Sequence, residues 1–169
     1  MNAVDQAVLE LMQSIQHPVL DELMLIITHA VSYPVLLLVL ILLIYMKKEK
    51  MSIKMFIGLL IEATVIIAIK NITARPRPTP RGLNPKAAFP SGHSSRSTYL
   101  ALLFSEKWNK KIIWFSLAAL VMFSRLYLQV HHLTDIIGGI AVGSLVYWLV
   151  SKYELDTRIQ EKIKDYRKN

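Results

Sequence analysis

Residues 51–78 read MSIKMFIGLLIEATVIIAIKNITARPRP, a mostly apolar run that ends at Lys70 and passes at once into a basic, proline-containing block. The run is 20 residues long, about the length that an α-helix needs to cross the hydrocarbon core of a bilayer. The full chain has 169 residues, of which 53% are hydrophobic, and it holds several other long apolar runs. We therefore expect one small all-α domain, built as a bundle of transmembrane helices.

Four more segments outside this run are expected to cross the membrane. The first, residues 19–46, is mostly apolar and is broken at Ser32-Tyr33-Pro34. It is too short for two spans, so we expect one long, tilted helix that is kinked at Pro34. The expected organisation is an interfacial helix at 1–17, spans at 19–46, 51–70, 89–108, 111–130 and 132–152, and a tail at 153–169.

The segment 89–108 is the least apolar of these spans, because serine, threonine, histidine and arginine fill its first half. Its crossing decides where three polar blocks of the chain lie, namely residues 70–78, 90–93 and 124–135. If it crosses, all three blocks meet at one face of the membrane; otherwise the third block lies on the other side. A polar half-helix is tolerated inside a bundle where it lines a hydrated site. We therefore predict five spans in total.

The N-terminal stretch is expected to form an amphipathic helix that lies in the membrane interface. Apolar residues recur at helical spacing, and polar residues fall on the opposite face. The apolar set is Val4, Ala7, Val8, Leu11 and Ile15, and the polar set is Asp5, Glu10 and Gln13. The stretch carries no basic segment and no small-residue cleavage site, so we expect no removable signal peptide.

The formal net charge of +8 comes from basic residues that lie between the apolar runs and in the tail. This distribution is typical of membrane topology and contact with anionic lipid, and it argues against nucleic acid as a partner. Thirteen of the 20 basic residues fall on one face: Lys47, Lys48, Lys50, Lys54, Lys107, Lys110, Lys111, Lys152, Arg158, Lys162, Lys164, Arg167 and Lys168. The positive-inside rule then places the C-terminus in the cytoplasm and the polar blocks on the periplasmic or outer face of a bacterial inner membrane. The absence of cysteine excludes disulfides and thiolate metal sites.

The second polar block, Pro90-Ser91-Gly92-His93, is expected to begin a helix. Ser91 can cap the helix, Gly92 allows close approach to the backbone, and the free N–H groups of the first turn attract anions. His93 would lie beside this anion-binding turn. Alone, such a turn is an ordinary helix start, but beside the other two blocks it indicates phosphate binding.

In the third block, His131 and Asp135 are four residues apart at the start of the last span. A helix places both on one face, so the carboxylate can accept a hydrogen bond from one imidazole nitrogen. The other nitrogen then keeps its lone pair and can act as a nucleophile or base. The alternative is an interfacial pair that merely ends two helices. His132 points about 100° away on such a helix and is expected to be a bystander or a headgroup contact.

Lys70, Arg77 and Arg125 lie at span ends, on the face that the charge distribution makes external. Arginine presents forked donors that match phosphate oxygens, and lysine acts as a point charge. With the amides of Ser91 and Gly92, they could surround the equatorial oxygens of a phosphoryl transition state. Four further basic residues indicate headgroup contacts or a second phosphate: Arg75, Arg81, Lys86 and Arg96.

The three blocks resemble, in full and in order, the signature of the type 2 phosphatidic acid phosphatase (PAP2) superfamily. The matching residues are Lys70, Arg77 and Pro78 for K-x6-R-P, residues 90–93 for P-S-G-H, and Ser124, Arg125, His131 and Asp135 for S-R-x5-H-x3-D. The resemblance implies that His131 attacks phosphorus to give a phosphohistidine, that Asp135 orients it, and that His93 protonates the leaving oxygen and later activates water. The implied phosphate ligands are Lys70, Arg77, Ser91, Gly92 and Arg125, with no metal or other cofactor. Arg75 is expected to be auxiliary, because only Arg77 keeps the six-residue gap from Lys70.

These expectations describe a metal-independent membrane phosphatase that acts on a phosphorylated lipid at the outer leaflet, without an obligatory protein partner. Candidate substrates are undecaprenyl diphosphate, phosphatidylglycerophosphate, phosphatidate and the 1-phosphate of lipid A. One alternative is a non-catalytic transporter or flippase, which the absence of an inverted repeat disfavours. Another is a metalloenzyme with His93, His131, His132 and Asp135 as ligands, which the surrounding cations disfavour.

Overall fold

The computed structural model describes residues 2–79, 87–154, 159 and 161, and every regular element in these residues is an α-helix. The elements are α1 (Ala3–Ser14), α2 (Pro18–His29), α3 (Tyr33–Tyr45), α4 (Glu49–Thr73), α5 (Gly92–Trp108), α6 (Lys111–Tyr127) and α7 (Leu133–Lys152). The predicted all-α class is therefore confirmed.

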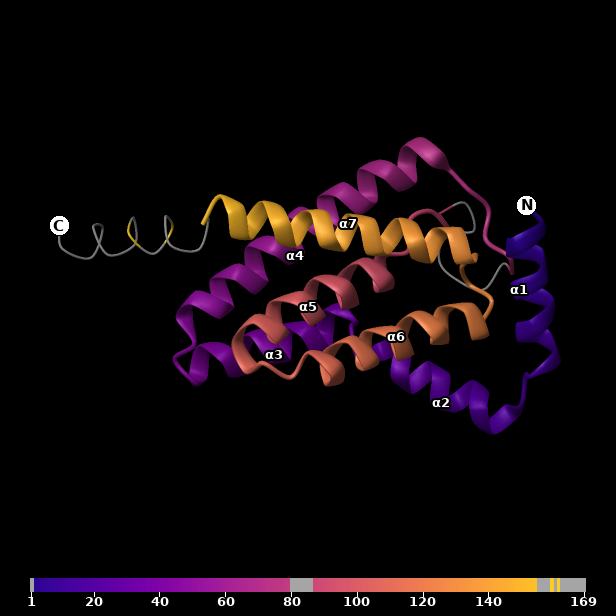
Figure 1. The fold of residues 1–169 in the computed structure, drawn as a ribbon, viewed down its shortest axis with the longest axis horizontal. Coiled ribbons are helices and arrows are strands. Elements are labelled where there is room, and N and C mark those ends of the chain that lie inside the picture. The colour runs from indigo at the N-terminus through magenta and orange to yellow at the C-terminus, as the bar shows by residue number, and fades with distance from the viewer. Residues whose placement is uncertain (1, 80–86, 155–158, 160, 162–169) are drawn as a thin grey trace.

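Helices α2 to α7 run lengthwise or obliquely along the molecule, and α1 lies across one end, where it packs on α6 and α7 (Figure 1). The connection after α4 and the turn between α6 and α7 lie at this same end. The turns between α3 and α4 and between α5 and α6 lie at the opposite end. All three polar blocks therefore gather at one end of the bundle.

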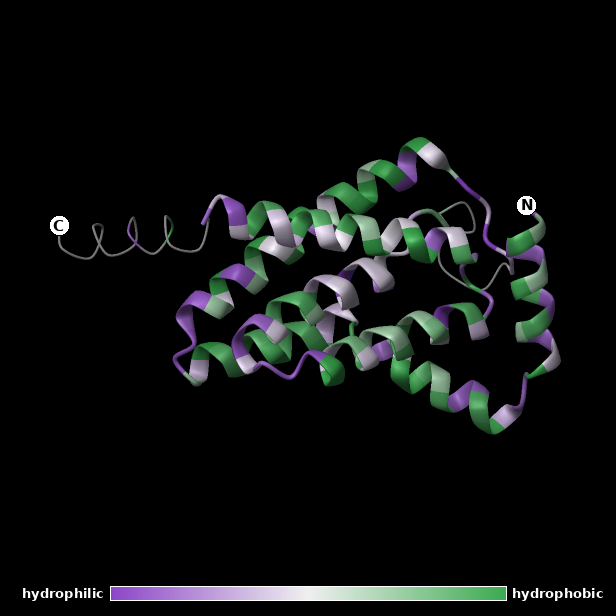
Figure 2. Cartoon of the chain, viewed as in Figure 1, coloured by the Kyte–Doolittle hydropathy of each residue, from purple (hydrophilic) through white to green (hydrophobic). Residues whose placement is uncertain are grey.

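Two helices, α4 and α7, are each long and apolar enough to cross a membrane. The pair α2 and α3 passes the same test when taken together, and α5 and α6 have only 17 residues each. Figure 2 shows hydrophobic residues along most of the helices and hydrophilic residues near their ends. The structure thus supports up to three spans by length and composition, and the five-span count stays a prediction.

The segment predicted as one kinked helix over residues 19–46 is two helices, α2 and α3, bent by 46°. The break lies at residues 30–32, and Pro34 falls in the first turn of α3. Proline suits this position because its missing N–H would have no partner inside the helix anyway. Pro34 therefore helps to start a new helix, where the sequence had predicted a kink.

Helix α5 packs against α4, α6 and α7 and is the central helix of the bundle. Eleven of its 17 residues are buried, including Ser94, Ser95, Ser97 and Thr98. The hydroxyl group of Ser97 donates to the carbonyl of Ser94 at 3.1 Å, which is a common way for a serine inside a helix to find a partner. A helix that faces other helices needs no apolar surface for lipid, which explains the weak hydropathy of this segment.

Two glycines on α7 let it approach the backbone of α5 closely. A Cβ added to Gly139 would lie 2.5 Å from the carbonyl oxygen of Ser91, and one added to Gly143 would lie 2.3 Å from that of Ser95. Small residues four positions apart are a common way to bring two membrane helices together. This close approach at Gly139 and Gly143 holds the first turn of α5 against this part of α7.

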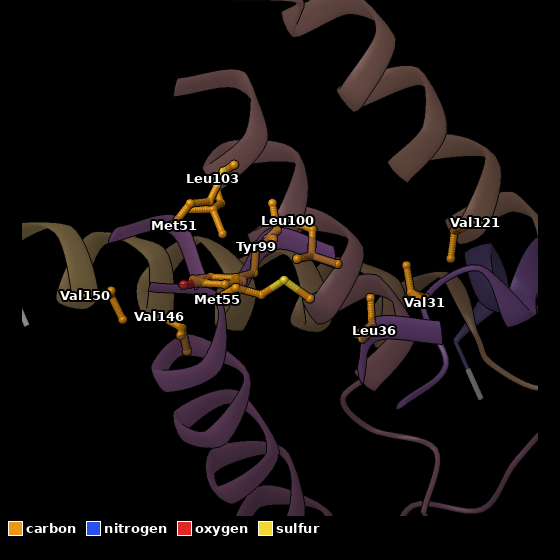
Figure 3. Packing of buried hydrophobic residues seen from close by; sticks show 11 residues of the cluster. Val31, Leu36, Met51, Met55, Tyr99, Leu100, Leu103, Val121, Val146 and Val150 are labelled. Carbon is orange, nitrogen blue, oxygen red and sulfur yellow. The ribbon is translucent and has the colours of Figure 1, made fainter. Parts of the chain in front are cut away.

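The main hydrophobic core lies in the half of the bundle away from the polar blocks. It contains side chains from helices α3, α4, α5, α6 and α7. In Figure 3, Tyr99 of α5 lies beside Met55 of α4, and Val146 of α7 is nearby. The hydroxyl group of Tyr99 donates to the carbonyl of Lys54 at 2.6 Å. This core holds the central helix in position along its length.

The amphipathic helix predicted at residues 1–17 is present as α1, but its faces differ from the prediction. Asp5 and Met12 are buried against the bundle, whereas Val4 and Leu11 are 59% and 57% exposed. Asp5 had been predicted to lie on the exposed polar face. Val4 and Leu11 therefore point away from the protein, and the carboxylate of Asp5 points into it.

Candidate active site

Five residues that the sequence predicted to act on phosphate lie close enough together to interact electrostatically. They come from separate parts of the chain: Lys70 in the last turn of α4, Arg77 in the connection after it, His93 at the start of α5, Arg125 in the last turn of α6, and His131 in the turn between α6 and α7. Two imidazoles and three cations thus share one small region.

The ring of His131 lies between a carboxylate and a cation. Its Nδ1 atom is 3.5 Å from Oδ2 of Asp135, and its Nε2 atom is 3.4 Å from Nη1 of Arg77. A proton on Nδ1 would face the carboxylate, which leaves the lone pair of Nε2 on the side of the guanidinium group. Nη1 of Arg77 also donates to the carbonyl of Val130 at 2.9 Å, which holds the guanidinium beside the ring.

Burial lowers the pKa of His131 to about 4; the interaction with Asp135 acts in the opposite direction, and the nearby cations Arg125, Arg77 and Lys70 add to the lowering. Burial also lowers the pKa of Arg77, although its guanidinium group stays protonated. The structure therefore favours a neutral imidazole at neutral pH.

Asp135 is completely buried and makes its contacts at the start of α7. Its Oδ2 atom accepts from the backbone N–H of His132 at 2.8 Å and lies 3.2 Å from Nδ1 of the same residue. Helix α7 begins only at Leu133, so the capping turn brings His131 to Asp135, not a regular helix as expected. His132 is buried and caps the helix, which contradicts its predicted role as a bystander or headgroup contact.

The Pro-Ser-Gly-His block begins α5 as predicted, with Ser91 as the cap and Gly92 as the first helical residue. The hydroxyl oxygen of Ser91 accepts from the hydroxyl of Ser94 at 2.9 Å. The backbone N–H of Ser91 donates to the carbonyl of Asp135 at 2.9 Å. The Ser91 amide is therefore engaged within the protein, which corrects the expectation that it binds phosphate.

Two of the cations are oriented by partners that the sequence did not suggest. Nη1 of Arg125 donates to the hydroxyl oxygen of Thr28 at 2.6 Å, and Thr28 is buried on α2. Nζ of Lys70 donates to the carbonyl of Ala87. Thr28 is an isolated threonine in an apolar helix, and only the tertiary structure shows its role.

Arg75, expected to be an auxiliary headgroup contact, is instead paired with two carboxylates. Its Nη1 atom lies 2.6 Å from Oδ1 of Asp135 and 2.6 Å from the hydroxyl of Thr134, and its Nη2 atom lies 2.8 Å from Oδ2 of Asp5. Burial raises the pKa of Asp5, but hydrogen bonds from Thr134 and Arg75 outweigh it, so the pKa lies below its ordinary value. Nothing in the sequence indicated that Asp5 belongs to this site, because Asp5 lies 65 positions or more before the polar block 70–78 that contains Arg75.

Arg96 is also placed differently from the expectation that it contacts a headgroup. It is only 7% exposed, its Nη2 atom lies 3.5 Å from Nδ1 of His93, and its guanidinium group lies 4.3 Å from the ring centre of Tyr33. A Cβ on Gly92 would be 3.9 Å from Nη1 of Arg96 and 4.0 Å from the buried carboxyl group of Glu62. Arg96 thus belongs to the bundle interior, and the other two predicted headgroup residues, Arg81 and Lys86, lie outside the described residues.

The arrangement combines a neutral imidazole, a buried carboxylate behind it and cations in front of it. An imidazole held in this way can attack an electrophile, and cations around the electrophile stabilise the negative charge that develops there. Within the described part of the chain, no three histidine, aspartate or glutamate side chains are grouped to hold a metal ion. The geometry suits an anionic electrophile such as a phosphoryl group.

Sequence comparison places this arrangement among known proteins. Residues 51–158 match the profile of the PAP2 superfamily. A lipid A 4′-phosphatase of Porphyromonas gingivalis is 31% identical over an alignment that covers 87% of this chain and 71% of that protein. Phosphatidylglycerophosphatase B of Bacillus subtilis is 28% identical, with 98% and 87% covered.

Two crystal structures share the fold. Aquifex aeolicus LpxE superimposes with a TM-score of 0.80 and 27% identity, covering 90% of this chain and 97% of that one. The first transmembrane PAP2 type phosphatidylglycerolphosphate phosphatase from Bacillus subtilis superimposes with a TM-score of 0.77 and 27% identity, covering 91% and 87%.

Proposed function

This chain belongs to the PAP2 superfamily, and from that premise we propose that it hydrolyses a lipid phosphate through a phosphohistidine formed on His131. Its curated relatives are phosphatases with lipid substrates, so the predicted class, a membrane lipid phosphatase, is confirmed. The catalytic residues, the leaflet and the substrate are the proposal.

The first step is attack by Nε2 of His131 on phosphorus. A bond forms between nitrogen and phosphorus, the bond from phosphorus to the lipid oxygen breaks, and His93 gives a proton to that oxygen. Asp135 balances the positive charge that develops on the ring of His131. Lys70, Arg77 and Arg125 balance the charge on the phosphoryl oxygens.

The second step returns the enzyme to its starting state. His93, now neutral, takes a proton from water, and the water oxygen attacks phosphorus. The bond between phosphorus and nitrogen breaks, and inorganic phosphate leaves. The proton taken from water leaves His93 protonated, so the acid needed for the next turnover is restored by its use first as acid and then as base.

The orientation of the His131 ring carries the proposal. Nδ1 is 3.5 Å from Asp135 and Nε2 is 3.4 Å from Arg77, so the nitrogen that keeps its lone pair faces a phosphate-binding cation. A purely structural His–Asp pair gives no reason for a half-buried guanidinium group to lie against the second nitrogen. A nucleophile whose target is a phosphate does give one.

We infer that the substrate is a lipid monophosphate and that its apolar chain lies between the helices. The two curated relatives are named for lipid A 4′-phosphate and phosphatidylglycerophosphate. An apolar cavity of about 230 Å³ lies between the α2–α3 break, α5 and α6, and its lining includes Ile27, Ser97 and Ala118. Ile27 is next in sequence to Thr28, the hydroxyl partner of Arg125, which supports a place for the lipid chain near the polar site.

We also propose that the protein crosses the inner membrane five times with the site facing the periplasm or the exterior. The end opposite the site carries most of the basic residues that the structure describes outside the polar blocks: Lys47, Lys48, Lys50, Lys54, Lys107, Lys110, Lys111 and Lys152. The positive-inside rule assigns this end, with the C-terminus, to the cytoplasm. Labelling of single cysteines introduced into the α3–α4 turn and into α1, with an impermeant thiol reagent on whole cells, tests the orientation.

The catalytic proposal is tested with purified protein in detergent, in the presence of EDTA and with a panel of lipid monophosphates and diphosphates. His131→Ala and His93→Ala are expected to abolish phosphate release and to keep the thermal transition of the parent protein. His17→Asn is the matched control, because His17 is exposed and asparagine can still cap α2. Vanadate is expected to inhibit, since it imitates pentacoordinate phosphorus.

Two results would overturn the proposal. Phosphate release that survives His131→Ala would exclude a phosphohistidine on this residue. Lipid binding or lipid movement that persists in that variant, with no phosphate release by the parent protein, would favour the transporter alternative.

A further inference from the structure

Helix α1 reaches the catalytic centre through one buried carboxylate. Asp5 is 1% exposed, and both of its oxygens are engaged. Oδ1 accepts from the backbone N–H of Thr134 at 3.1 Å, and Oδ2 accepts from the hydroxyl of Thr134 and from Nη2 of Arg75, both at 2.8 Å. Thr134 and Arg75 are also the neighbours of Asp135, so α1 touches the machinery behind His131.

The result is a row of alternating charges that ends at the proposed nucleophile. Asp5 pairs with Nη2 of Arg75, Nη1 of Arg75 pairs with Asp135, and Asp135 faces His131. The carboxyl groups of Asp5 and Asp135 are both completely shielded from solvent, so water screens these interactions little.

The charge count explains why a second carboxylate is useful. Asp135 has to offset the positive charge that grows on His131 during attack, yet a guanidinium group lies only 2.6 Å from it. The charges of the Arg75 and Asp135 side chains alone sum to zero. With Asp5 the group carries a net charge of −1, and a negative charge remains available to His131.

We propose that Asp5 is a positioning residue of the active site, which acts through Arg75 to keep the carboxylate of Asp135 oriented and negative toward His131. This inference rests on the proposed role of His131 as the nucleophile. Asp5 does not contact the phosphate in this scheme. The N-terminal helix thereby becomes part of the catalytic apparatus.

A simpler possibility is that Asp5 only fastens α1 to the bundle. Both possibilities predict some loss of activity when Asp5 is changed, so a single substitution does not separate them. They differ in what removal of Arg75 should do when Asp5 has already been neutralised. If Asp5 balances the charge of Arg75, removal of both charges leaves Asp135 with a net charge of −1 toward His131, and activity should rise again. If Asp5 only fastens α1 to the bundle, removal of Arg75 as well takes away a second contact, and activity should not recover.

The test compares Asp5→Asn, the double variant Asp5→Asn/Arg75→Gln and the control Glu10→Gln. Glutamine can still donate a hydrogen bond to Asp135, and Glu10 is an exposed carboxylate on the same helix. Asp5→Asn is expected to lower kcat by about 10- to 100-fold, as loss of an outer partner of a catalytic group commonly does, and to leave KM within about threefold. The kcat of the double variant is expected to be at least about fivefold higher than that of Asp5→Asn. Glu10→Gln should have the kcat and KM of the parent protein.

Each remaining result counts against the inference. An unchanged kcat in Asp5→Asn would exclude a role in catalysis. A double variant as slow as Asp5→Asn, or slower, would show that Asp5 only anchors α1, and so would a loss confined to KM. His131→Ala, measured in parallel, tests the proposed function separately, because its activity decides whether His131 is the nucleophile whatever Asp5 does.

Discussion

The backbone N–H of Ser91 donates to the backbone carbonyl of Asp135 at 2.9 Å. This bond joins the first turn of α5 to the first turn of α7, 44 positions apart in the sequence. Since His93 follows Ser91 and His131 lies beside Asp135, the bond also sets the distance between the two imidazoles. Close packing of α5 on Gly139 and Gly143 supports the same junction.

Gly143→Ala is expected to destabilise the protein by about 1–3 kcal/mol, the usual cost of overpacking a tight contact. The added methyl group would lie 2.3 Å from the carbonyl oxygen of Ser95, so the two helices must move apart. Thermal unfolding in detergent measures the loss. Ala141→Leu adds volume on an exposed part of α7 and should change little; equal melting temperatures for Gly143→Ala and the parent protein would refute the packing argument.

His131 is expected to stay neutral from pH 7 to about pH 5, because burial and neighbouring cations lower its pKa to about 4 from the ordinary 6.5. Nuclear magnetic resonance of protein labelled with ¹⁵N-histidine can follow this residue, with His131→Gln to assign its signals. A His131 signal that titrates near the ordinary value would contradict the burial argument. The nucleophile is lost only as the pH falls through the lowered pKa, so activity limited by this group should decline near pH 4.

The same lowered pKa couples folding to pH. Between pH 6.5 and about 4 the unfolded chain binds a proton at His131 and the folded protein does not. The contribution of His131 to the free energy of unfolding should therefore be constant above pH 6.5 and should decrease as the pH falls toward 4. In His131→Gln this part of the decrease should be absent, which unfolding curves at pH 7.5 and about pH 4.5 can measure; an identical decrease in both proteins would exclude His131 as its source.

Thr28→Val is expected to raise KM by about 10-fold with little change in kcat, because a hydrogen bond to a charged group is lost and Arg125 can turn away from the phosphate. Valine has nearly the same shape as threonine, so packing on α2 should survive. Steady-state kinetics with a lipid monophosphate gives both constants. Thr28→Ser keeps the hydroxyl group and should restore KM; failure of serine to do so would mean that shape, not the hydrogen bond, matters here.

Ala118→Phe is expected to lower kcat/KM for a long-chain lipid phosphate by about 10-fold, since the ring would fill part of the apolar cavity. A short-chain soluble phosphate ester should be hydrolysed as before, because its reaction does not need the cavity. Parallel assays with the two substrates make the comparison. An equal loss for both would point to a disturbed fold and against a site for the lipid chain.

Much of the active site could be predicted from the sequence because its residues lie in short, characteristic blocks. The spacing of Lys70 and Arg77 and the Pro-Ser-Gly-His turn are local patterns, and so is the gap between His131 and Asp135. Each implies a particular chemistry before any fold is known. The structure brings these residues together at one end of the bundle, although their catalytic roles stay predictions.

Contacts between distant segments could not be predicted in the same way. Asp5 and Thr28 sit in sequences that read as ordinary interfacial and apolar helices, and nothing local marks their partners. Arg75 was expected to face a headgroup because a single sequence shows its charge but not the two carboxylates that neutralise it. The break before Pro34 was missed for a related reason, since a proline either kinks a helix or starts one, and tertiary packing decides which.

The contact between Asp5 and Thr134 joins residues that are 129 positions apart. During translation, a ribosome completes α1 long before α7 is available, so the junction closes only after nearly all of the bundle has entered the bilayer. A chain interrupted midway would already contain Lys70 and Arg77 but would lack His131. Such a fragment could bind anions without cleaving them, and hydrolysis would begin only once biosynthesis had joined the earliest helix to the last.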